Sequence, residues 1–254
     1  GESELFYFRK LHFLIDFCWN LNVYKPLLKA AHFYNVNPLD VFKIILESVE
    51  GARDSENESQ RMISEFFNRF DEFSHSEWFD SAEEIENYFT DGTNFQRLIE
   101  QEFDKLNILF SVILLKEYKP AFDIVIKESI SSFLSVPKEI LESVSAFVWA
   151  IFPSIDLTSN EKTVSFPENL AALNRESADK FIPSANRKLV KLLETYKRRE
   201  VCKLLADTQS KTLSKVLNAR GAGSLFLRNL QMVPSEKSCS LPHWLVSNQP
   251  DETN

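Results

Sequence analysis

Glycine is nearly absent from this chain, and that scarcity limits the available folds more than any other feature. Only 5 glycines occur among 254 residues, against a usual share of about 7%. Tight turns with positive φ depend on glycine, so hairpin-rich β folds and glycine-looped nucleotide sites are disfavoured. We therefore expect an all-α fold.

Apolar residues recur three and four positions apart along the first 152 residues, which is typical of amphipathic helices. Asn37 precedes Pro38 and predicts an N-cap, and Asp80 or Ser81 predicts another. In the longest predicted helix, one apolar stripe is expected to face the core. It consists of Phe95, Leu98, Ile99, Phe103, Leu106, Phe110, Ile113 and Leu114. The predicted helices cover residues 5–21, 24–34, 39–49, 61–73, a segment after residue 81, 93–118, 120–134 and 138–152.

The chain changes character after residue 152. Residues 153–182 contain Pro153 and Pro167 and are followed by Pro183, which predicts an extended connector with one short helix near 168–173. Residues 183–237 then predict a small module of three short helices, at 187–195, 198–206 and 210–218. This order, followed by an apolar stretch, favours a winged-helix-like layout. Residues 238–254 predict a loosely ordered tail.

Charge divides the chain in the same place. Residues 1–182 carry 17 Lys and Arg against 31 Asp and Glu, whereas residues 183–237 carry 12 against 4. The expected architecture is thus an acidic, Phe-rich helical body, residues 1–152, joined to a basic module. One interpretation is that the two parts attract each other and dock. The other is that the module receives an anionic partner.

Six basic residues are the candidate partner-binding residues of the module. They are Arg198, Arg199, Lys203, Lys211, Lys215 and Arg220. An acidic peptide or protein is the expected partner, and residues 224–233 are a candidate edge for strand addition. Nucleic acid is a less favoured partner, because the module shows no base-reading residues at a helix start and the acidic body repels phosphate.

Residue patterns for catalysis, cofactors and metals are missing from the sequence. The four histidines have no ligand spacing, and neither a nucleophile elbow nor a phosphate loop occurs. His12 and Asp16 lie one helical turn apart and read as a surface pair. Cys202 has basic neighbours that would lower its pKa, but a buried apolar role is favoured. We expect no catalytic, cofactor-binding or metal-binding residues, and no activity of the chain on its own.

The remaining composition bears on location. The three cysteines are scattered and odd in number, which indicates a reducing compartment such as the cytoplasm. No apolar run is long enough to span a bilayer, so we expect no membrane partner. Trp244 lies in a polar tail, where it either docks onto a partner or folds back onto the body.

Two stretches carry a family resemblance. They run from Arg9 through Asn20 together with Asn37 to Phe42, and from Asn94 to Asn107. They resemble the helical region that follows the catalytic barrel in cobalamin-binding radical SAM enzymes. The CxxxCxxC motif of that family is absent here, so the resemblance implies a non-catalytic piece and transfers no catalytic residue.

Together these observations predict a non-catalytic binding or partner protein. Its basic module would recognise an anionic peptide or protein, and its aromatic body would dock a partner. Two alternatives stay open: an accessory part of a metallo- or radical-type modifying enzyme completed by another chain, and a nucleic-acid-binding module.

Overall fold

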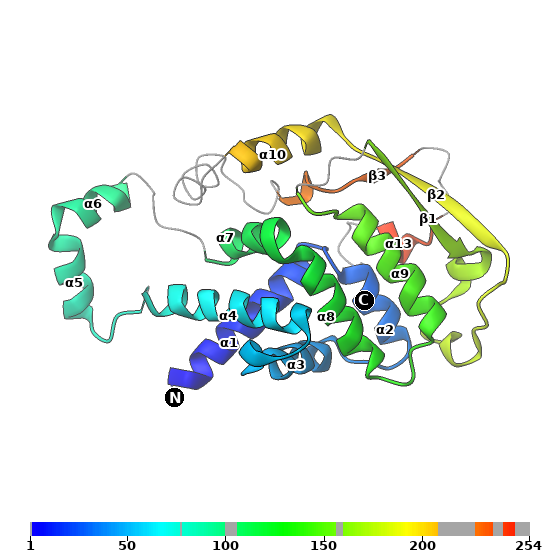
Figure 1. Cartoon of the computed structure of the whole chain (residues 1–254), viewed down its shortest axis with the longest axis horizontal. Coiled ribbons are helices and arrows are strands. Elements are labelled where there is room, and N and C mark those ends of the chain that lie inside the picture. Colours follow the sequence, from blue (N-terminus) through cyan, green and yellow to red (C-terminus); the bar gives the residue numbers. More distant parts are fainter. Residues whose placement is uncertain are drawn as a thin grey trace.

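The computed structural model describes residues 2–76, 78–99, 106–155, 160–207, 227–235 and 241–246. The described chain is mostly helical and carries a small sheet at one side (Figure 1). Its α-helices are α1 Glu2–Ile15, α2 Lys25–Phe33, α3 Pro38–Val49, α4 Glu58–Ser76, α5 Ala82–Thr90, α6 Gly92–Ile99, α7 Leu106–Ile113, α8 Lys119–Ser131, α9 Lys138–Ile151, α10 Tyr196–Asp207 and α13 His243–Val246.

The helical body is built around clustered phenylalanine rings. Phe13 of α1 lies 5.2 Å from Phe70 of α4 between ring centroids, and Phe70 lies 5.0 Å from Phe110 of α7. Phe17 continues the cluster toward Phe122 of α8 at 6.0 Å. All five rings are buried. Each buried ring stabilises the fold by roughly 1.5–3 kcal/mol.

Local signals in the sequence set several helix ends correctly. The Asn37 side chain accepts a hydrogen bond from the Leu39 amide at 3.0 Å and caps α3. Ser81 caps α5 in the same way, by accepting from the Glu84 amide at 3.2 Å. Both caps satisfy backbone donors that a helix start leaves without partners. The predicted N-caps are confirmed.

Two π-helical segments lengthen the helices of the body. Asp16–Asn20 (η1) extends α1, and Leu114–Tyr118 (η3) joins α7 to α8. The sequence predicted separate helices on either side of Pro120, but residues 106–131 run as one continuous helical rod. Pro120 lies in the first turn of α8, directly after the wide turn of η3, where the missing backbone donor interrupts the rod least.

The sheet corrects two expectations. β1 Glu161–Pro167 pairs antiparallel with β2 Arg187–Leu193, and β2 pairs with the short β3 Val233–Pro234. Residues 187–195 were predicted as a helix, but Val190 and Leu192 are buried and Leu189 and Lys191 are exposed, which is the period of a strand. Short apolar runs leave helix and strand ambiguous, and pairing with β1 decided for the strand.

The predicted connector 153–182 is therefore part of the folded structure. It supplies β1, and Glu168–Ala172 (η4) forms the short helix predicted near 168–173 as a 3₁₀ turn. Two further 3₁₀ turns lie at Ala52–Asp54 (η2) and Ala178–Lys180 (η5).

Body and sheet share one hydrophobic core. Phe147 of α9 contacts Phe166 of β1 with ring centroids 5.5 Å apart, and α9 packs along β1. From α10, Val201 and Leu205 enter the same cluster. Helix α10 confirms the helix predicted at 198–206, whereas the predicted helix 210–218 lies outside the described residues. The winged-helix-like layout is not confirmed.

None of the described helices is both long enough and apolar enough to cross a membrane.

Candidate functional site

Helices α5 and α6 form an arm that projects from the helical body (Figure 1). The two helices pack chiefly on each other, and neither contains a buried residue. We call residues 82–99 the arm. Such a projection differs from the rest of the body, whose helices all bury apolar side chains in the common core.

The arm exposes the apolar stripe that the sequence placed in the core. Phe95, Leu98 and Ile99 are 51%, 47% and 59% exposed, and Ile85 of α5 is 43% exposed. The prediction that the stripe faces the core is wrong for Phe95, Leu98 and Ile99. It is confirmed for four later members of the same stripe, Leu106, Phe110, Ile113 and Leu114, which are buried. Phe103 lies outside the described residues. Apolar side chains at i, i+3 and i+4 form the helix face that usually packs against other parts of a protein. Here no described part of the chain buries that face.

Capping interactions fix the arm locally. The Glu84 carboxylate accepts from the Asp80 amide at 2.9 Å, which completes the Ser81 cap. Asp91 caps α6 by accepting from the amides of Thr93 and Asn94, at 2.8 and 3.2 Å. These backbone hydrogen bonds lower the pKa of Asp91. The arm is therefore held in helical form without burial in a core.

Negative charge accompanies the apolar stripe. Residues 80–99 hold five acidic residues, and Arg97 is the single basic one. Glu83 and Glu86 are both exposed on α5. The arm thus presents apolar side chains and carboxylates on one projecting element.

Arg198, a predicted partner-binding residue, lies in the interior. Its side chain is 1% exposed and pairs with Glu194, itself 2% exposed, at 2.5 Å. The guanidinium also donates to the carbonyl oxygens of Leu230 and Ser154, at 3.0 and 3.4 Å. Arg198 anchors α10 to the sheet and the end of α9, so it is not available to a partner.

The other five predicted residues divide into two groups. Arg199 is exposed but donates to Glu194 at 3.2 Å and to Asn160 at 3.3 Å, while Lys203 is exposed on α10. Lys211, Lys215 and Arg220 lie outside the described residues. Within the described residues, the structure therefore brings Arg198 and Arg199 together on Glu194 rather than on an open surface.

An exposed face of α10 remains beside this buried pair. It contains Tyr196, which is 71% exposed, together with Lys197, Arg199 and Lys203. We call these four residues the α10 face. Glu194 neutralises Arg198 internally, whereas Lys197 and Lys203 are exposed to solvent.

Another buried ion pair lies in the body. Lys119 donates to Asp123 at 2.5 Å within α8, and the Tyr24 hydroxyl donates to the same carboxylate oxygen at 2.6 Å. Lys119 is buried, and burial lowers its pKa below the ordinary value. Burial also raises the pKa of Asp123, despite its cationic partner. Tyr24, Lys119 and Asp123 are all buried, so we assign the cluster a structural role.

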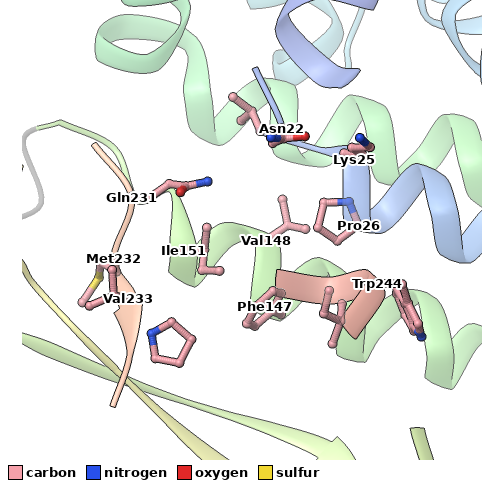
Figure 2. Close-up of a pocket in the computed structure, with 13 residues that line it drawn as sticks. Asn22, Lys25, Pro26, Phe147, Val148, Ile151, Gln231, Met232, Val233 and Trp244 are labelled. Atoms are coloured by element: carbon pink, nitrogen blue, oxygen red, sulfur yellow. The ribbon is translucent and has the colours of Figure 1, made fainter. Parts of the chain in front are cut away.

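A small cavity lies between the body and the end of the chain (Figure 2). Its volume is about 120 Å³, and it is lined by residues of α2, α9, β3 and α13. In Figure 2, Val148 and Ile151 of α9 lie between Lys25 and Pro26 on one side and Met232 on the other. Sites for drug-sized ligands measure about 300–1,000 Å³, so this cavity does not match them.

Trp244 folds back onto the body beside that cavity. Its ring lies edge-on to Phe33 of α2 with centroids 5.3 Å apart. Of the two interpretations of Trp244, docking onto a partner or folding back onto the body, the structure therefore shows the folding back.

His12, Asp16 and the cysteines were the candidate residues for catalysis or metal binding. His12 contacts the side-chain amide of Asn107 at 3.2 Å, and Asp16 accepts from Asn20, so the His12–Asp16 pair does not form. Cys18 and Cys202 are both buried, and burial raises the pKa of Cys18. Within the described ranges, no three His, Cys, Asp or Glu side chains gather in a way that could hold a metal ion.

No protein-family model, curated protein or solved structure matches this chain. The resemblance to cobalamin-binding radical SAM enzymes stays a prediction.

Proposed function

We propose that this chain is a non-catalytic binding protein whose arm docks a partner protein. The observation that carries the proposal is the exposed stripe of Phe95, Leu98 and Ile99 on a capped, projecting helix. Apolar area exposed to water costs about 25 cal/mol per Å², and contiguous exposed patches mark interaction sites in folded proteins.

The chemistry of the arm defines the partner. An apolar surface would cover the stripe, and basic side chains would meet Glu83 and Glu86 at its edge. Complementary charges at the rim set the orientation and speed of docking, while the apolar centre supplies the affinity. The partner surface is therefore apolar and basic.

A photo-cross-linking experiment tests this proposal. The chain carries a benzophenone amino acid in place of Phe95 or, as control, of Leu134, which is 99% exposed in the loop before α9. We expect cross-links to a defined protein from Phe95 alone. The captured protein is then purified and its affinity measured by calorimetry.

The affinity measurement decides the outcome. Phe95→Asp and Leu98→Asp should weaken binding by at least about tenfold, since central apolar contacts carry most of an interface's energy. Leu134→Asp is the matched control and should leave the affinity unchanged. Equal affinities for all of these variants would rule the arm out as the docking element.

Nucleic-acid binding is the second candidate function. It is supported by the excess of 12 basic over 4 acidic residues in 183–237 and by the exposed Lys197 and Lys203. It predicts retention on heparin that falls steeply with salt and with Lys197→Glu. A role as an accessory part of a modifying enzyme predicts instead a stoichiometric metal or chromophore in the complex with its partner.

We place the protein in a reducing compartment such as the cytoplasm. The scattered cysteines support this, as does the buried free thiol of Cys18.

A further inference from the structure

We propose that the arm of one molecule docks onto the α10 face of a second copy of this chain. The inference rests on the proposed function, because it names the apolar and basic surface that the arm requires. It also gives the basic residues of the module an anionic partner, which is the arm itself.

The first step is charge complementarity between the two surfaces. Residues 80–99 carry five acidic residues against Arg97. On α10, Lys197, Arg199 and Lys203 are exposed against the exposed carboxylate of Glu200, while Arg198 is neutralised internally by Glu194. Opposite potentials on two surfaces of one chain favour association between copies and oppose contacts of like with like.

The second step is that both surfaces combine charge with apolar area. On the arm, Phe95 and Ile99 are more than half exposed, and on α10 the Tyr196 ring is 71% exposed. The Tyr196 hydroxyl donates to Glu200, one turn along the helix, at 2.5 Å. Tyrosine is one of the residue types that most often anchor protein interfaces.

The third step is that the two surfaces do not meet within one molecule. In Figure 1 the arm projects at one end of the molecule, and α10 lies over the body beside the sheet. Arg198 and Glu194 pin α10 in that position through a buried ion pair. A second copy can supply the α10 face, and in a twofold dimer each arm reaches the other molecule, so the contact forms twice.

A charge-exchange experiment tests the proposal on the full chain. The first variant carries Glu83→Lys with Glu86→Lys, and the second carries Lys197→Glu with Lys203→Glu. All four side chains are exposed, so both variants should fold, as checked by circular dichroism. Each variant brings like charges together and should self-associate at least about tenfold more weakly than the natural chain in sedimentation equilibrium.

The decisive measurement is the mixture of the two variants. In the mixture, the lysine arm of one chain meets the glutamate α10 face of the other, and the reciprocal contact keeps its natural charges. We expect association to return to near the natural strength. Lys138→Glu on α9 lies outside both surfaces and serves as the control, with association unchanged.

Three outcomes would overturn the inference. They are a natural chain that stays monomeric across the micromolar range, self-association that ignores the charge changes, and cross-links between arm and α10 that form only within one chain. The proposed function would still stand in each case if the arm captured another protein, and if Phe95→Asp weakened the binding of that protein.

Discussion

At the scale of single residues, two buried ion pairs decide what the polar chemistry of this chain does. Lys119 with Asp123 lies inside the body, and Arg198 with Glu194 lies between α10, the sheet and α9. Buried pairs are costly to desolvate, and they are most destabilising when one partner is lost. Substitutions in both pairs therefore test structural roles, and one of these residues, Arg198, was predicted from the sequence to bind a partner.

Lys119→Met should destabilise the fold because it leaves the Asp123 carboxylate buried without its cation. We expect a loss of about 3–5 kcal/mol in the free energy of unfolding, measured in urea at pH 7. Adding Asp123→Asn should restore much of this loss, since the amide oxygen still accepts from Tyr24. If the double variant were no more stable than Lys119→Met, the uncompensated charge of Asp123 would not be the cause of the loss.

The same variant has a defined pH dependence. Without Lys119, burial raises the pKa of Asp123 further, because the cation that opposes the rise is gone. A carboxyl with a raised pKa in the folded state gives stability that is present at low pH and is lost as pH rises through that pKa. The loss in free energy of unfolding caused by Lys119→Met should therefore be smaller at about pH 4 than at about pH 7. An equal deficit at both values would contradict this.

Arg198→Ala should destabilise the fold by about 3–5 kcal/mol, because Glu194 would stay buried without its partner. Lys203→Ala, on the exposed side of the same helix, should change the free energy of unfolding by less than about 0.5 kcal/mol. Thermal unfolding of both variants measures the difference. Equal stabilities of the two variants would show that the Arg198–Glu194 pair does not stabilise the fold, and Arg198 could then bind a partner as the sequence predicted.

At the scale of elements, the arm is held by its caps rather than by a core. Ser81 and Asp91 bind the first amides of α5 and α6, and the arm contains no buried residue. Helices this short are marginal in water without tertiary contacts, so each cap contributes a large share of the arm's local order.

Acid should loosen α6 before it unfolds the body. Backbone hydrogen bonds lower the pKa of Asp91 below its ordinary value of 3.8. A lowered pKa gives stability that is present above 3.8 and is lost as pH falls through the folded-state pKa. Hydrogen exchange at the amides of Thr93 and Asn94 should then show reduced protection, while the α4 amides stay protected. Asp91→Asn keeps a capping oxygen and should abolish the pH dependence.

At the scale of the whole molecule, the helical body and the sheet behave as one unit. Phe147 packs on Phe166, and the core cluster continues from α1 through α9 into β1, β2 and α10. Among the described residues, one hydrophobic cluster therefore contains residues from both sides of the predicted connector, 153–182.

Truncation tests that unity. A chain that ends at Ile155 removes β1 and leaves the Phe147 side of α9 exposed to water. We expect it to aggregate or to melt without a cooperative transition, whereas the full chain should show a single transition by calorimetry and circular dichroism. A truncated chain that melts cooperatively at the original temperature would show that residues 1–155 form a domain of their own.

Particular residues show how far sequence reasoning reached. Asn37 and Ser81 identified their caps correctly, because a cap depends on neighbours within three residues. The strand at 187–193 and the exposure of Phe95 could not be predicted in this way. The first depends on pairing with β1, about 25 residues earlier in the chain, and the second on which surfaces remain to cover an amphipathic helix.

The sequence by itself determined the helical body, its aromatic core and the division of charge, since periodicity, capping and composition act over short distances. Only the tertiary structure decided that Arg198 pairs with Glu194 in the interior, that Phe95, Leu98 and Ile99 are exposed to solvent, and that Trp244 packs against Phe33 of α2. Burial and ion pairing depend on segments far apart in the chain, and no local pattern records which of them meet.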